Sequence, residues 1–168
     1  MADGDEDILN SIIGKPTGKS KVVIERGPVS FFAEAVLEES PIYRDPKAAE
    51  SAGLPNIPAP PTFGFSMENW GKFPELQPAD APEGHPLMAV LGPLTAKGGI
   101  ILHGEQEFIY HRPVVVGDVL VGDGKVVDAY QKESKGKTMT FVVAETNFTD
   151  EKTGEPVVTT RYNILHRI

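Results

Sequence analysis

Proline is the residue that most restricts how this chain can fold. Eleven of its 15 prolines lie between Pro41 and Pro93, and four of them fall in the run PNIPAPP at residues 55–61. Because proline fixes φ at about −65° and lacks a backbone N–H, this run can be neither a helix nor a central strand. The chain of 168 residues is long enough for one domain with its own core. Within that domain we expect residues 72–98 to be mostly loop.

Composition excludes several classes of function. The formal net charge is −8, with 24 acidic and 16 basic residues, whereas a nucleic-acid surface needs clustered Lys and Arg. No apolar run approaches the ~20 residues of a membrane span, and the acidic N-terminus does not resemble a signal peptide. We therefore expect neither a nucleic-acid nor a membrane partner.

The sequence also lacks the common motifs that bind cofactors and metals. Without cysteine the chain has no disulfide framework, thiol nucleophile or thiolate zinc site, which favours a cytoplasmic location. The sequence contains no His-x-x-x-His pair, acidic metal box or Gly-rich phosphate loop. We expect no cofactor and no metal.

Residues 1–14 are predicted to form an acidic tail followed by a short amphipathic helix, which Gly14 and Pro16 end. Residues 15–168 are predicted to form the folded domain. It begins with a strand at Lys19–Glu25.

A helix opened by Pro28 follows and stops at Pro41. Beyond the proline run, Thr62–Gly71 is predicted to be a buried helix, because its large apolar residues repeat every three to four positions: Phe63, Met67 and Trp70.

The last 70 residues read as a sheet. Polar and apolar residues alternate in four runs separated by turn residues, as expected of half-buried antiparallel strands. The runs are Ile100–His111, Val119–Tyr130, Thr138–Phe148 and Pro156–Leu165. Helices followed by an antiparallel meander predict an α+β fold.

Three segments add a family resemblance: FFAEAVLEESPIYRDPKAAESAGLPNIPAPPTF, HGEQEFIYHRPVVVGD (His103 to Asp118) and TNFTDEKTGEPVVTTRYNILHR. In this order they resemble the N-terminal (FAS1-like) hot-dog domain of the MaoC-like dehydratases. That branch includes the non-catalytic subunits of the heterodimeric (3R)-hydroxyacyl-ACP dehydratases of mycobacteria. The resemblance covers about residues 15–167.

The resemblance implies a single hot-dog fold, in which an antiparallel sheet is wrapped around a central helix. Residues Pro60 to Gly71 would begin that helix. The ligand would be an acyl-CoA or acyl-ACP thioester. The reaction would be hydration of a trans-2-enoyl thioester, or the reverse dehydration.

The catalytic motif of the family is degenerate in this sequence. Active members carry Asp-x-Asn-Pro-x-His, and alignment on Pro41 places Glu38, Ser40 and Tyr43 at the Asp, Asn and His positions. Tyrosine, with a reference pKa of ~10, is a poor base near neutrality. Glutamate is one methylene longer than aspartate, and misplacing a base by about an ångström can cost ~100-fold in rate. We therefore expect no intact catalytic pair, and weak or no activity from the isolated chain.

The start of the predicted central helix is the candidate substrate-binding segment. Its prolines stiffen the approach, and the backbone N–H groups of Phe63 and Gly64 could face a thioester oxygen. Gly64 could instead serve only for close packing against the sheet. Aromatic residues nearby could line an acyl tunnel or belong to the core. The candidate binding residues are Pro60, Pro61, Thr62, Phe63, Gly64, Met67 and Trp70.

Two candidates lie outside the motif. His103 shares a predicted strand with His111, about 26 Å away, so the two cannot form one site. Glu68 falls in the predicted buried helix, where a carboxylate is costly unless paired or functional. It could point to solvent, or be the base of a hot-dog thioesterase.

These observations leave four hypotheses. The first is a subunit of an enoyl thioester hydratase or (3R)-hydroxyacyl thioester dehydratase, supplying acyl tunnel and interface while a MaoC-type partner supplies the catalytic pair. The second is a self-sufficient homodimeric enoyl-CoA hydratase using Glu38 or His103. The third is a non-enzymatic acyl-thioester-binding protein, and the fourth a thioesterase. Because a lone hot-dog domain exposes a sheet edge, we expect a homodimer or heterodimer.

Overall fold

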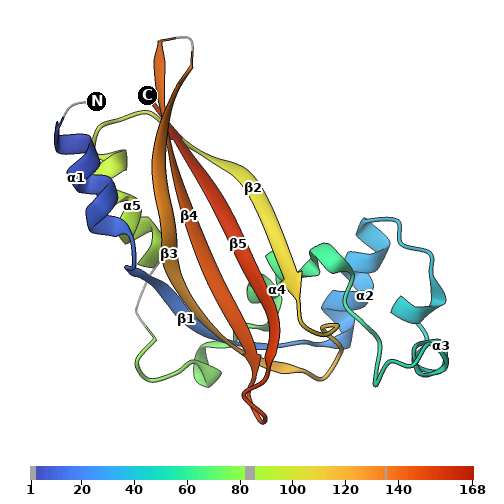
Figure 1. Cartoon of the computed structure of the whole chain (residues 1–168). Coiled ribbons are helices and arrows are strands. Elements are labelled where there is room, and N and C mark those ends of the chain that lie inside the picture. The colour runs from blue at the N-terminus through green and yellow to red at the C-terminus, as the bar shows by residue number, and fades with distance from the viewer. Residues whose placement is uncertain (1–2, 82–85, 135) are drawn as a thin grey trace.

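The computed structural model describes residues 3–81, 86–134 and 136–168. One long antiparallel sheet runs through it, with α1 and α5 against one part of the sheet and α2, α3 and α4 near the other (Figure 1). The strands are β1 (Pro16–Val23), β2 (Ile100–Tyr110), β3 (Val119–Ser134), β4 (Lys137–Asp150) and β5 (Pro156–Arg167). The helices are α1 (Asp3–Ile12), α2 (Arg26–Ala35), α3 (Pro46–Ser51), α4 (Met67–Gly71) and α5 (Pro86–Thr95), with 3₁₀ turns η1 (Pro41–Tyr43), η2 (Pro61–Phe65) and η3 (Pro74–Leu76).

The strand order is β1-β3-β4-β5-β2, and every pairing is antiparallel. The four strands predicted from alternation are confirmed, and β1, predicted as Lys19–Glu25, pairs with β3 along one edge of the sheet. The other edge is β2, whose register shifts at a bulge between His103 and Glu105. The α+β prediction is confirmed.

Four of the helices, α1, α2, α4 and α5, pack on one face of the sheet and bury two separate apolar clusters. The first, here called the α4 core, joins η2, α4 and α2 to the sheet: Val22, Ile24, Val29, Ile57, Phe63, Met67, Val114, Leu120, Phe148, Val157 and Val158. The second, the α5 core, joins α1 and α5 to the sheet: Leu9, Ile12, Val90, Leu91, Leu94, Val126, Val142 and Ile164. Side chains along a strand alternate between its two faces. The residues that the two clusters take from β4 (Val142 and Phe148) and from β5 (Val158 and Ile164) are an even number of positions apart. Both therefore lie on the same face, called the inner face below.

The prediction that residues 72–98 are mostly loop is wrong. They contain α5, a ten-residue helix that buries Val90, Leu91 and Leu94 against the sheet. Pro86 stands at its first position, where the missing N–H costs nothing, and Pro93 lies inside it. Burial of the apolar side stabilises the helix despite that proline, because tertiary packing outweighs intrinsic propensity.

The prediction of one buried helix over Thr62–Gly71 is only partly correct. Phe63 and Met67 are fully buried, but the segment is split into η2 and the five-residue α4, and Trp70 is 46% exposed beside Phe31 of α2. The segment ends at Gly71, where glycine is required because a Cβ would lie 2.1 Å from the carbonyl oxygen of Val23. The expectation that Pro60–Gly71 begins a long central helix is therefore wrong: the longer apolar helix against the sheet is α5.

The N-terminal helix belongs to the same fold as the sheet, since Leu9 and Ile12 are buried in the α5 core. The boundary placed at residue 14 stays a prediction. Among the described residues, no helix has the length and apolar character needed to cross a membrane.

Candidate functional site

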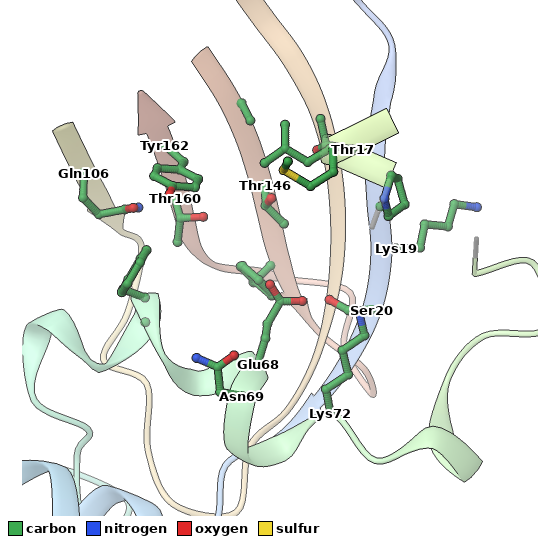
Figure 2. A pocket seen from close by; sticks show the side chains of 18 residues that line it. Thr17, Lys19, Ser20, Glu68, Asn69, Lys72, Gln106, Thr146, Thr160 and Tyr162 are labelled. Atoms are coloured by element: carbon green, nitrogen blue, oxygen red, sulfur yellow. The ribbon is translucent and has the colours of Figure 1, made fainter. Parts of the chain in front are cut away.

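A cavity of ≈ 420 Å³ lies on the inner face, in the region between the two cores. Its walls come from the start of β1, from α4, from the start of α5 and from the middle of β2, β4 and β5. Figure 2 shows the side chains that line it, with those of the sheet facing those of α4.

Small and polar residues on the inner face make room for the cavity. Along β4 the inner residues change from Phe148 to Thr146 and Ala144 before returning to Val142. Along β5 they change in the same way, from Val158 through Thr160 and Tyr162 to Ile164. The register places Thr146 opposite Thr160, so two hydroxyl-bearing residues lie side by side where a continuous core would place apolar side chains.

Two glycines of β3 allow cavity-wall residues to pack closely against the sheet. Gly122 and Gly124 are buried, and Gly124 pairs with Gly18 of β1 and with Thr146. A Cβ at Gly124 would lie 2.5 Å from Thr17 Oγ1 and 2.9 Å from Thr146 Oγ1. Glycine is therefore required there for two threonines of the cavity wall to approach the strand.

The opposite wall is charged. Glu68 and Asn69 project from α4 and Lys72 from the residue after it, and Figure 2 shows the Glu68 side chain extending into the cavity toward the sheet. Its place in the cavity lining agrees with the reading in which Glu68 faces a site, but both readings of its role stay predictions. Its side chain is nevertheless exposed, because the cavity is open to solvent.

Gln106 of β2 lines the cavity beside Tyr162, its register partner. Its Oε1 atom is buried and accepts no hydrogen bond from any residue that the structure describes. A buried acceptor without a partner carries a desolvation cost, so this atom marks a place where a ligand donor would be favourable.

His103 lies behind this wall. Its ring contacts that of Phe65 at a tilt and that of Tyr162 edge-to-face, with ring centroids 5.0 Å and 4.3 Å away, and both of those neighbours line the cavity. His111 lies beyond the end of β2 and contacts Thr159 Oγ1 through Nε2 at 3.2 Å. The two histidines do not share a site.

The degenerate motif lies outside the cavity, between α2 and α3. The Glu38 carboxylate accepts a hydrogen bond from the backbone N–H of Ser40 at 2.9 Å, and Arg44 donates to the Glu38 carbonyl at 2.8 Å. None of Glu38, Ser40 and Tyr43 lines the cavity. The glutamate carboxylate therefore holds the turn before η1.

Tyr43 is protonated under ordinary conditions. Burial, and secondly the Glu38 charge, raise the pKa of its phenol above the usual value. Burial, with a smaller contribution from Tyr43, raises the pKa of Tyr110 to about 12. Tyr110 donates its hydroxyl proton to the Pro61 carbonyl. Neither phenol can act as a base near neutrality.

Of the predicted substrate-binding residues, Gly64 lines the cavity, whereas Pro60, Pro61, Thr62, Phe63, Met67 and Trp70 do not. The expectation that the backbone N–H of Phe63 is a free donor is wrong, because this N–H donates to the Pro60 carbonyl at 2.9 Å. Gly64 also packs closely on the sheet: a Cβ there would lie 3.1 Å from the Phe108 ring. The role of these residues toward a substrate stays a prediction.

One further group of charges is structural. Arg112 forms a bidentate ion pair with the buried Asp118 at 2.8 Å and 3.1 Å and also reaches Asp150 at 3.0 Å. Asp118 accepts from the Val115 N–H as well, so these residues hold the turn before β3. The described residues contain no cluster of three or more His, Asp and Glu placed to hold a metal.

The cavity residues of the sheet were missed by sequence reasoning. Thr146 and Thr160 look like ordinary strand residues, and only the register brings them together. The available signal was the pair of glycines in VLVGDGKVV, which interrupts an apolar strand at two inner positions.

Comparison with known proteins identifies the family. The sequence profile of the FAS1-like dehydratase domain region matches residues 11–160. A UPF0336 protein of Saccharopolyspora erythraea is 33% identical over 144 residues, which cover 86% of this chain and 81% of that protein.

Solved structures share the fold. The ChsH1–ChsH2 complex of Mycobacterium tuberculosis matches with a TM-score of 0.76 and 20% identity, covering 99% of this chain and 92% of that chain. The C-terminally truncated HadBC (3R-hydroxyacyl-ACP dehydratase) complex of the same organism gives a TM-score of 0.67 and 20% identity over 92% of this chain and 96% of that chain. The predicted hot-dog fold is confirmed, since MaoC-like dehydratases share it. The chain belongs to the family of the FAS1-like dehydratase domain region.

Proposed function

We propose that this chain is the non-catalytic subunit of an enoyl thioester hydratase or (3R)-hydroxyacyl thioester dehydratase. The observation that carries the proposal is the degenerate motif. The carboxylate at its Asp position is bound to the Ser40 N–H, and the residue at its His position is a phenol with a raised pKa. Syn hydration needs a base and an acid at the substrate, and this loop lacks the Asp–His pair that supplies them in active members of the family.

A partner subunit of the MaoC type would supply the missing pair. The two similar structures named above are heterodimeric complexes, which supports a partner for this chain. The β2 edge is suited to such pairing. It presents exposed apolar residues, including Ile100, Leu102 and Ile109, and an unpaired strand edge readily joins a second sheet. The ligand would be an acyl-CoA or acyl-ACP thioester, and we expect the complex in the cytoplasm.

Glu68 supports a second candidate, a thioesterase. Its carboxylate extends into the cavity (Figure 2), where it could activate a water molecule against a thioester carbonyl. Hydrolysis would release the free acid and the free thiol of CoA, whereas hydration leaves the thioester intact. The product therefore distinguishes the two functions.

The test is an assay of purified chain with crotonyl-CoA and a longer enoyl-CoA, alone and mixed with a catalytically complete MaoC-type subunit. Hydration only in the mixture supports the proposal. Robust hydration by the chain alone, abolished by a change at Glu38 or His103, would instead identify a homodimeric hydratase. Tight binding with no turnover in either sample would identify an acyl-thioester-binding protein, and release of free CoA a thioesterase.

A further inference from the structure

The middle of the inner face is unlike the interior on either side of it. The register aligns Gly18, Gly124, Thr146 and Thr160 in one row across β1, β3, β4 and β5. Over these four strands the row carries no large apolar side chain, although it ends on Phe108 of β2 and the α4 core and the α5 core flank it. An alkyl chain would gain little from this wall, because hydrophobic stabilisation scales with the apolar area removed from water.

Donors such as Lys72 and Asn69 lie on the cavity wall, but two acceptors face the row. Gln106 Oε1 is buried and without a partner among the described residues, and the Glu68 carboxylate points into the same space (Figure 2). The hydroxyls of Thr146 and Thr160 can either donate or accept. An alkyl group filling the cavity would leave the two acceptors desolvated and unpaired, whereas a ligand with O–H or N–H donors would satisfy them.

We propose that this cavity binds a portion of the thioester ligand that carries hydroxyl or amide N–H donors, with Glu68 and Gln106 as the residues that select for it over a plain alkyl chain. The inference rests on the proposed function for the identity of the ligand as a thioester. Two parts of such a ligand have this chemistry: a hydroxylated acyl group remote from the thioester, and the pantetheine arm with its two amides.

The test measures binding of hexanoyl-CoA, 6-hydroxyhexanoyl-CoA and pantetheine to the full-length chain by calorimetry. The variants are Glu68→Gln and Gln106→Leu, and the matched control is Glu75→Gln, an exposed glutamate of η3 outside the cavity. Melting temperature and circular dichroism establish that each variant is folded.

If the acyl group supplies the donors, 6-hydroxyhexanoyl-CoA binds roughly 10-fold tighter than hexanoyl-CoA, and both cavity variants reduce that ratio. If the pantetheine arm supplies them, both thioesters and pantetheine bind alike, and both cavity variants weaken all three. Either result supports the inference, provided that Glu75→Gln behaves like the wild type.

Two outcomes contradict it. In the first, the thioesters bind, but hexanoyl-CoA binds at least as tightly as its hydroxylated analogue and neither cavity variant changes the affinities. That result would overturn this inference and leave the proposed function standing. Failure of every thioester to bind, both to the chain alone and to its complex with a MaoC-type subunit, would overturn the proposed function, and the inference with it.

Discussion

Replacement of Gly124 by alanine tests whether the close approach of Thr17 and Thr146 to β3 depends on glycine. The added Cβ would lie 2.5 Å from Thr17 Oγ1 and 2.9 Å from Thr146 Oγ1, both closer than the 3.0 Å that real Cβ atoms keep. Overpacking of this kind costs about 1–3 kcal/mol. Relief of the glycine entropy term returns about 0.5–1 kcal/mol. We expect a net loss of about 1–2 kcal/mol.

The assay is thermal unfolding of wild type and variant at matched concentration. For a chain of this size, 1 kcal/mol corresponds to roughly 2–4 °C, so Gly124→Ala is expected to lower the melting temperature by about 2–8 °C. The matched control is Gly92→Ala in α5, where a Cβ meets no atom within 4 Å. Alanine is the better helix former, so the control should melt at the same temperature as the wild type or slightly higher.

A second variant isolates the contact. Thr17→Ala removes the hydroxyl that the new Cβ would meet at the shorter distance. The double variant Gly124→Ala/Thr17→Ala is therefore expected to lose less stability than the two single changes sum to. A Gly124→Ala protein as stable as the wild type, or strict additivity in the cycle, would refute the packing account of this row.

Three further substitutions test other parts of the structure. Met67→Ala, at a fully buried position, is expected to cost about 2–5 kcal/mol in urea unfolding; a loss below 1 kcal/mol would place Met67 outside the core. Leu37, which is 85% exposed, ends α2 with a φ of 58°, so Leu37→Gly should raise the unfolding free energy by up to ~1 kcal/mol, whereas Val36→Gly should not. Arg161 chiefly, followed by Asn147, lowers the pKa of Glu145. The ionised Glu145 side chain therefore stabilises the fold above its unfolded pKa of ~4.3, and this stabilisation is lost as the pH falls through its lower folded pKa. Between pH 6 and 3 the melting temperature of Glu145→Gln should fall less than that of the wild type, and parallel curves would contradict the ion pair.

Local patterns predicted the sheet well because each strand carries its own signal. Alternation in β4 and β5 is visible in the sequence, and the predicted hairpin turns are where the structure has them. The α5 helix was missed because Pro93 counts locally against a helix, while its stabilisation comes from residues of α1 and the sheet that are distant in sequence.

The site was less predictable than the fold. Glu68 could be singled out as an unusual carboxylate in an apolar segment, and the structure places it in the cavity. Thr146, Thr160 and Gln106 carry no such signal, because an isolated polar residue in a strand normally faces solvent. Their meeting depends on the register of three strands, and register is a long-range property of the fold.

The central claim is that the catalytic groups belong to a partner and not to this chain. The most direct test is the steady-state rate of crotonyl-CoA hydration by the complex with a MaoC-type subunit, in which one chain at a time is altered. We predict that replacing the partner's motif histidine by alanine lowers the rate by at least 100-fold. Glu38→Gln and Tyr43→Phe in this chain should change it by less than about threefold, since Glu38 holds a turn and Tyr43 stays protonated. A loss of 100-fold or more from either change in this chain, with a folded complex, would contradict the account.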